Sequence, residues 1–275
     1  MIERVPVAGQ DGGMAHTHGT ALVTGASRGI GRAVALELAR RGFEVVATMR
    51  DPSAGADLPD AGEGRISVQR LDVTDPATID LPDDLSVLVN NAGVECEYLP
   101  IEHAPIEQWR RVFETNVFGV AEVTRRAVPV MRRRGGGVIV NVTSSSVLVA
   151  MPFYGIYRAS KAAVTAMGES LASEVGRFGI RVVEVMPGPI ATDMLAGSAR
   201  MPEAAAHEGY RDLAQEAYEG RMGIETMTTD PAAAARDIVD AATDPDSGLK
   251  VGCDDLGRQL ISTWRVDPEA LLSFG

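Results

Sequence analysis

Tyr157 and Lys161 are the two residues of this chain whose types and spacing most directly suggest chemistry. They stand four positions apart, so they project from one face if the segment is helical. A free tyrosine has a pKa near ~10, and a positive charge within about 4–6 Å favours the phenolate and lowers that pKa. The pair could therefore donate and accept a proton. The alternative is an ordinary helix that carries a structural Tyr and a solvated Lys.

A glycine-rich turn lies near the start of the chain, between a predicted strand and a predicted helix. Residues 20–24 form an apolar run, the turn 25–31 carries three glycines, and an apolar helical pattern continues to Gly42. Backbone amides of such a turn can approach a pyrophosphate at the helix N-terminus, where the helix dipole favours anions. A tight turn without a ligand is the alternative, but the flanking strand and helix favour a dinucleotide site.

Strand and helix patterns alternate along most of the chain. Strands are predicted at 20–24, 44–49, 66–71, 86–89, 137–142, 181–186 and 249–252. Helices are predicted after the glycine turn, at 109–131, around Tyr157 and at 231–242. This alternation predicts an α/β fold with one doubly wound parallel sheet of about seven strands and helices on both faces. The connection between 71 and 86 is short for a parallel crossover, with only 77–79 helical in pattern.

Two segments depart from this alternation. Residues 1–18 are rich in glycine and polar residues, so we expect a flexible N-terminal extension before a domain at 19–275. Residues 193–229 are polar and rich in Met and Ala, with helical stretches near 202–221. Because they follow a strand end, they are expected to form either a small helical lid over a substrate pocket or a plain pair of surface helices.

Composition excludes several classes of function. The chain has 275 residues and a formal net charge of −12, which argues against nonspecific nucleic-acid binding. No apolar run reaches about 18 residues, so no membrane span is expected, and no secretory signal is recognised. Cys96 and Cys253 are the only cysteines, which predicts a reduced, cytoplasmic setting. His16 and His18 lack further ligands nearby, so no metal site is expected.

Several motifs occur in one order along the chain. They are Thr-Gly-Ala-Ser-Arg-Gly-Ile-Gly at 24–31, Asn-Asn-Ala-Gly at 90–93, Asn116, Ser144, Tyr157 with Lys161, and Pro-Gly at 187–188. In this ordered set, over roughly residues 19–260, the chain resembles the short-chain dehydrogenase/reductase family. The resemblance implies a Rossmann-type fold and an oxidoreductase that interconverts a ketone or aldehyde and an alcohol with a nicotinamide dinucleotide.

The resemblance also implies roles for four residues. Tyr157 would exchange a proton with the substrate oxygen, and Lys161 would lower the pKa of Tyr157 and hold the nicotinamide ribose. Ser144 would hydrogen-bond the substrate oxygen; it is chosen over its serine neighbours because it precedes Tyr157 by 13 positions, as the family's serine does. Asn116, a polar residue on an apolar helical stripe, would hold a water that links Lys161 to solvent.

The cofactor site implied by the resemblance spans the whole series of motifs. It consists of Gly25, Ser27, Arg28, Gly29, Ile30, Gly31, Arg50, Asp72, Val73, Asn91, Ala92, Gly93, Tyr157, Lys161, Pro187, Gly188, Ile190 and Thr192. Asp72 and Val73 would hold the adenine, and Ile190 and Thr192 would contact the carboxamide or the diphosphate.

The end of the second strand bears on the choice of cofactor. An acid there would bind the ribose 2′-hydroxyl of NAD and repel the 2′-phosphate of NADP, but Met49 occupies that position. Arg50 follows it and Arg28 lies in the glycine turn, and two guanidinium groups suit a phosphate. NADP(H) is therefore favoured over NAD(H), with Asp51 expected either to point away or to cap the next turn.

Substrate, assembly and alternative functions are less constrained. The segments 46–51 and 249–274 resemble those of family members that act on lipophilic alcohols such as steroids and retinoids. Pocket residues are expected from 94–99, 145–156 and 189–225, where Met151, Phe153, Tyr154 and Met194 form either an apolar wall or part of the core. Members often dimerise through the helices that contain Asn116 and Tyr157, so a homodimer or homotetramer is expected. The alternatives are an NAD(H)-dependent alcohol dehydrogenase, a non-catalytic dinucleotide-binding sensor, and an epimerase or dehydratase.

Overall fold

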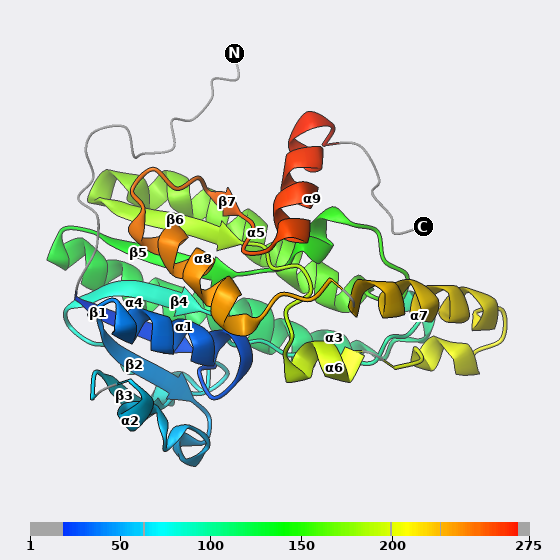
Figure 1. Cartoon of the computed structure of the whole chain (residues 1–275), viewed down its shortest axis with the longest axis horizontal. Coiled ribbons are helices and arrows are strands. Elements are labelled where there is room, and N and C mark those ends of the chain that lie inside the picture. Colours follow the sequence, from blue (N-terminus) through cyan, green and yellow to red (C-terminus); the bar gives the residue numbers. More distant parts are fainter. Residues whose placement is uncertain (1–18, 63, 199, 226, 269–275) are drawn as a thin grey trace.

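Seven parallel strands form one sheet in the computed structural model, which describes residues 19–62, 64–198, 200–225 and 227–268 (Figure 1). The strands are β1 (Thr20–Thr24), β2 (Glu44–Met49), β3 (Ile66–Arg70), β4 (Leu85–Asn90), β5 (Gly137–Val142), β6 (Ile180–Val185) and β7 (Lys250–Val251). Their order across the sheet is β3-β2-β1-β4-β5-β6-β7. The order reverses between β1 and β4, and this is the switch point at which open α/β sheets bind ligands. The predicted fold class is confirmed.

Helices cover both faces of the sheet (Figure 1). On one face α1 (Gly29–Arg40) and α8 (Pro231–Thr243) share a core cluster with Val87 of β4. On the other face α4 (Gly119–Arg134) and α5 (Gly155–Val175) share a second cluster with Leu88. Successive strand residues point to opposite faces, so Val87 and Leu88 pack in the two different core clusters. Burial on both faces also explains why every residue of β4 and β5 is buried.

The helix predicted at 109–131 consists of three consecutive pieces. α3 (Ile106–Phe113) runs into a π-helical turn (Glu114–Phe118), and α4 follows without a break. The π-turn contains Asn116, which is 1 % exposed and lies on the buried stripe as predicted. A π-turn inside an α-helix is uncommon and often marks a functional position.

The connection between β3 and β4 is short, as predicted, and its helical part is a single 3-10 turn in place of an α-helix. It holds a 3-10 turn (Pro76–Thr78), whose first turn is capped by Asp75 accepting from the Ala77 N–H. The buried Ile79 follows, and Nη1 of Arg126 in α4 donates to its carbonyl at 2.9 Å. The helix of the next crossover therefore supports this part of the sheet face.

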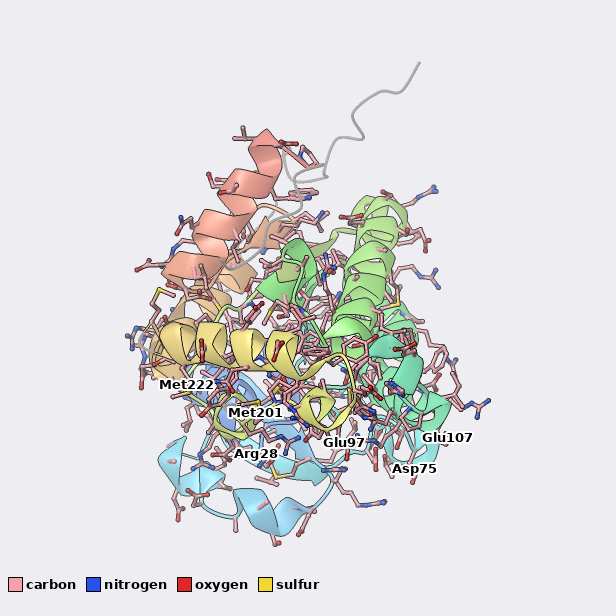
Figure 2. The ribbon with its side chains drawn as sticks, turned by 90° about the vertical axis from the view of Figure 1, so that its right-hand side faces the viewer. Arg28, Asp75, Glu97, Glu107, Met201 and Met222 are labelled. Atoms are coloured by element: carbon pink, nitrogen blue, oxygen red, sulfur yellow. The ribbon has the colours of Figure 1, made fainter. Side chains whose placement is uncertain are left out.

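The remaining elements lie mostly beyond the carboxyl ends of the strands, where the arrowheads point in Figure 1. They include α6 (Asp193–Ser198), a 3-10 turn (Glu203–Ala206), α7 (Arg211–Glu225) and α9 (Asp255–Val266), together with α2 (Leu58–Ala61) beside β3. Figure 2 views the molecule from this side, with α7 across the front and Arg28, Met201 and Met222 on the same face. The predicted helical stretch 202–221 thus becomes a 3-10 turn followed by α7. The predicted extension 1–18 lies outside the described residues.

None of the helices in the described part of the chain combines the length and the apolarity that a bilayer crossing needs.

Candidate active site

The turn that leads into α1 leaves the amino end of this helix open. Gly25 and Gly29 have φ values of +67° and +56°, which favour glycine, and a Cβ on Gly25 would lie only 2.9 Å from Cα of Ala92. Arg28 is the N-cap residue but makes no side-chain cap, and the first turn of α1 contains no acid. Free N–H groups and the positive end of the helix dipole therefore suit an anion such as a pyrophosphate.

Thr24 joins this turn to the loop that follows β4. Its hydroxyl accepts hydrogen bonds from the N–H groups of Asn91 and Ala92, both at 3.0 Å. In return, Nδ2 of Asn91 donates to the carbonyls of Thr24 and Gly25 at 2.9 and 3.1 Å. The two loops at the switch point are thus fixed to one another, and a rigid cleft results.

A cleft of about 310 Å³ opens at this place, and every predicted site residue except Gly31 and Asn116 lines it. The lining residues that the sequence predicted are Gly25, Ser27, Arg28, Gly29, Ile30, Arg50, Asp72, Val73, Asn91, Ala92, Gly93, Ser144, Tyr157, Lys161, Pro187, Gly188, Ile190 and Thr192. Residues from distant parts of the chain therefore meet at one surface, as the carboxyl ends of parallel strands require.

Gly31 does not belong to the lining, contrary to the prediction. A Cβ on this residue would overlap Nδ2 of Asn91 and lie 2.5 Å from the carbonyl oxygen of Gly25. The absence of a side chain here lets α1 pack closely against its own glycine turn. Its contribution is to packing, whereas Gly25 and Gly29 line the cleft.

Tyr157 and Lys161 lie one turn apart on α5, and both face the cleft. The ammonium of Lys161 lies 5.7 Å from the centroid of the Tyr157 ring and donates to the carbonyl of Val142 at 2.8 Å. Tyr157 is 8 % exposed and Lys161 is 6 % exposed. A hydroxyl and an ammonium thus converge in a largely dehydrated place, where their interactions with a bound molecule are strong.

Ser144 completes this group. Its side chain lowers the pKa of the Tyr157 phenol, and it caps the 3-10 turn Ser145–Leu148 by accepting from the N–H of Ser146 at 3.2 Å. Of these three consecutive serines only Ser144 lines the cleft, while Ser145 and Ser146 are buried beside it. The geometry therefore supports the choice of Ser144.

The charges around Tyr157 do not act as the sequence predicts. Burial raises the pKa of Tyr157 above its ordinary value, the carboxylate of Glu95 raises it further, and the hydrogen bond from Ser144 lowers it. Burial also lowers the pKa of Lys161 to about 8, against the opposing influence of Glu184 and Glu95. The predicted lowering of the pKa of Tyr157 by Lys161 is not seen: the net shift is upward, because loss of hydration and the charge of Glu95 outweigh the effect of Ser144. At neutral pH the phenol is a neutral proton donor beside a mostly protonated Lys161.

Asn116 lies beneath the cleft, outside its lining. Its Oδ1 accepts from the N–H of Val94 at 2.8 Å, and its Nδ2 donates to the carbonyl of Val94 at 2.9 Å and to Oγ of Ser160 at 3.1 Å. Both amide hydrogens are thus used by protein groups. The predicted water-holding role does not fit this side chain, which ties the loop after Gly93 to α5.

Comparison with known proteins identifies the family. Residues 19–203 match the family described as short chain dehydrogenase. A short-chain type dehydrogenase/reductase of Picea abies is 38 % identical over 211 residues, which make up 70 % of this chain and 77 % of that protein. The chain belongs to the short-chain dehydrogenase/reductase family. It is accordingly an oxidoreductase of alcohol and carbonyl groups that uses a nicotinamide dinucleotide.

Solved structures of short-chain dehydrogenases show the same fold with either dinucleotide. The Burkholderia cenocepacia protein in complex with NADP has a TM-score of 0.75 and 26 % identity, over 94 % of this chain and 97 % of that chain. The Burkholderia phymatum protein in complex with NAD has a TM-score of 0.77 and 25 % identity, over 93 % and 95 %.

The end of β2 is where family members can distinguish the two dinucleotides, and here it carries no acid aimed at the cleft. Met49 and Arg50 line the cleft. Asp51 turns to the next segment, where it accepts from the N–H and the hydroxyl of Ser53 at 3.0 and 2.8 Å. It caps the following 3-10 turn, which is one of the two outcomes predicted for it.

Asp72 and Arg28 complete the rim of this end of the cleft. Hydrogen bonds from Thr74 and the charge of Arg50 outweigh burial and hold the pKa of Asp72 below its ordinary value. Arg28 is 72 % exposed and forms an ion pair with Asp193 of α6 at 3.4 Å. An exposed pair of this kind is weakly held, so Arg28 can turn to another anion.

Glu95 is a lining residue that falls in the predicted pocket segment 94–99 but was not singled out from the sequence. It follows the Asn-Asn-Ala-Gly loop at the carboxyl end of β4 and faces the cleft beside Tyr154 and Tyr157. The available signal was an acid directly after a ligand-binding loop. Its partners, which come from two other segments, could not be read from spacing.

Proposed function

We propose that this short-chain dehydrogenase/reductase is an NADP(H)-dependent enzyme that interconverts a ketone or aldehyde and an alcohol by hydride transfer. The observation that carries the proposal is the meeting of Ser144, Tyr157 and Lys161 in the wall of one cleft that begins at the open amino end of α1. No residue of this group has been replaced by one unable to exchange protons, so catalysis is favoured over a purely sensing role.

Each side chain has a distinct task in reduction. The bound nicotinamide supplies the hydride. Tyr157, kept neutral by burial, donates its proton to the carbonyl oxygen as negative charge develops there. Ser144 donates a hydrogen bond to the same oxygen, and Lys161 stabilises the phenolate that remains. Asn116 acts as a positioning residue that holds the loop after Gly93 and the start of α5.

The cradle for the dinucleotide follows from the lining. Gly25 and Gly29 allow the pyrophosphate to approach the N–H groups of α1, and a Cβ on Gly93 would lie 3.5 Å from Nζ of Lys161. Arg50 and Arg28 flank the position where a 2′-phosphate would lie, and two guanidinium groups bind such a phosphate well. The NADP complex of the Burkholderia cenocepacia relative is consistent with this cofactor.

The proposal also includes a lid. The segment 193–229 covers the substrate end of the cleft, since Asp193, Met194 and Leu195 at the start of α6 line the cleft.

The proposal further includes a dimer. Two copies associate through α4 and α5, next to which Phe118 is 58 % exposed. Light scattering tests the dimer, and we expect the mutation Phe118→Lys to shift the protein toward a monomer.

Reduction of a panel of ketones and aldehydes, followed at the nicotinamide absorbance, tests the activity. Tyr157→Phe removes the proton donor, so turnover should fall by about 10²–10⁴-fold while NADPH still binds. Tyr218→Phe in α7, which does not line the cleft, is the matched control. Substantial turnover by Tyr157→Phe would contradict the role of the phenol, and binding without turnover in the wild type would favour a sensor.

Arg50→Ala tests the choice of cofactor. Loss of a charge-assisted contact to the 2′-phosphate should weaken NADPH by about tenfold or more, with a much smaller change for NADH. The control is Arg65→Ala, which removes an arginine paired with Glu44 outside the cleft. Equal losses for both dinucleotides would remove the argument for NADP(H).

A further inference from the structure

Glu95 places a carboxylate in the wall of the cleft, next to the proton donor. The tilted rings of Tyr154 and Tyr157 have centroids 5.1 Å apart, and Glu95 and both tyrosines line the cleft. A charged residue so close to the proposed reaction centre faces whatever part of the substrate extends beyond its carbonyl group. None of the tasks assigned above to Ser144, Tyr157 and Lys161 uses it.

Two phenols hold this carboxylate in place. The hydroxyl of Tyr154 donates to Oε1 of Glu95 at 2.6 Å, and the hydroxyl of Tyr98 donates to Oε2 at 2.9 Å. The two rings stack with centroids 5.3 Å apart, and Tyr98 is 2 % exposed. The two hydroxyl donors fix the orientation of the carboxylate group. Its oxygens offer about four lone-pair directions, and the phenols use two of them.

A cation and the carboxylate both lie near these tyrosines. The guanidinium of Arg221 lies over their rings, with its central carbon 3.9 Å from the centroid of the Tyr98 ring and 5.3 Å from that of Tyr154. The charge of Glu95 acts on the phenols inside the cleft, since it adds to burial in raising the pKa values of Tyr154 and Tyr157. The wall beside the reacting group is therefore negative and rich in hydrogen-bond acceptors.

We infer that Glu95 selects the substrate: the cleft takes a ketone or aldehyde that carries a hydroxyl or ammonium group beyond its carbonyl, and it disfavours keto acids. The inference rests on the proposed reductase function and narrows its substrate class. A hydroxyl or ammonium hydrogen can donate to a free lone pair of Glu95. A substrate carboxylate would bring a like charge to a partly dehydrated site, where repulsion is strong.

Three matched ketones test this selection: 4-(hydroxymethyl)cyclohexanone, 4-methylcyclohexanone and 4-oxocyclohexanecarboxylate, each with its 3-substituted isomer. They share a ring and differ in donor, apolar or anionic character. For the wild type, we expect kcat/KM to be highest for the hydroxymethyl ketone and about tenfold or more lower for the carboxylate. Glu95→Gln removes the charge with little change of shape, so the ratio of carboxylate to hydroxymethyl rates should rise about tenfold or more.

The matched control is Glu97→Gln, which removes a neighbouring carboxylate that is exposed and does not line the cleft (Figure 2). It should leave the ratio of rates at the wild-type value. A merely structural role for Glu95 would lower the unfolding temperature of Glu95→Gln without moving this ratio. An unchanged ratio in a folded Glu95→Gln protein would overturn the inference.

A second measurement needs neither turnover nor a Glu95 variant. Ligand-observed NMR ranks the binding of the same ketones to Tyr157→Phe protein, and the carboxylate should bind most weakly. Reduction of ketones by the wild type together with equal binding of the three ligands would overturn the selection and leave the reductase function intact. The expected ranking without reduction by the wild type would support the selection and refute the reductase function.

Discussion

Glu184 should make the stability of the fold depend on pH. This residue of β6 is 0 % exposed, and Nδ2 of Asn141 donates to its Oε1 at 2.7 Å. Burial raises its pKa to about 8; the hydrogen bond from Asn141 and the charges of Lys250 and Lys161 oppose the shift, and Glu169 adds to it. In the unfolded chain a glutamate releases its proton near its ordinary pKa of 4.5. Between these values the folded protein therefore holds one more proton than the unfolded chain.

The sign and size of the effect follow by linkage. The stability associated with this proton is fully present below pH 4.5 and is lost as the pH rises through about 8. Each unit of pKa shift corresponds to about 1.4 kcal/mol, so the whole window amounts to at most about 5 kcal/mol. Glu184→Gln is neutral at every pH and does not show this loss. The variant should therefore gain stability relative to the wild type as the pH rises from 5 to 8, and the difference should then level off.

Urea denaturation of both proteins at fixed concentration, from pH 5 to pH 9, measures this difference. Subtracting the two curves removes the contributions of titrating groups that do not interact with Glu184. The matched control is Glu107→Gln, which removes an exposed carboxylate of α3 that does not shift the pKa of Glu184 and should follow the wild-type curve. A difference between Glu184→Gln and the wild type that stays constant with pH would refute the reasoning.

Three further predictions concern the site. The rate of carbonyl reduction should fall as the pH rises through about 8, because Lys161 then loses its charge; a flat rate between about pH 7 and pH 9.5 would contradict this. Gly31→Ala should lower the free energy of unfolding by about 1–3 kcal/mol, because the new methyl group overlaps Asn91; an unchanged urea midpoint would count against that clash. Asn116→Ala should cost about 1–3 kcal/mol in denaturant unfolding, since it leaves the backbone groups of Val94 without partners, and an unchanged stability would argue against this role.

The strands and the glycine turn could be predicted because their signals are local. Apolar runs bounded by turn residues identified the strands, and the short stretch between 71 and 86 indicated a minimal crossover there. The π-turn at Glu114–Phe118 was not predicted, because the apolar stripe continues through it with nearly the same period. Spacing alone carries no information on that local change of hydrogen bonding.

The residues that line the cleft were largely predictable, but their electrostatics were not. Gly31 and Asn116 occur in motifs that meet at the cleft, yet whether such a residue lines the cleft or supports it depends on packing from other segments. The direction of the pKa shift of Tyr157 depends on burial, which a four-residue spacing does not report. The carboxylate of Glu95 needed Tyr98 and Tyr154 to be brought together before its position had meaning.

Tyr98 contacts both the cleft wall and the segment 193–229. Its phenol holds Glu95, while its N–H donates to Oε2 of Glu203 at 2.9 Å and its carbonyl accepts from the N–H of Ala204 at 3.1 Å. A chimera that takes residues 193–229 from another family member would lose the contacts that Glu203 and Ala204 make with Tyr98. Because Tyr98 also holds Glu95, the wall of the cleft would be disturbed as well. Residues 95–103 and 193–229 should therefore be exchanged together when the substrate end of the cleft is replaced.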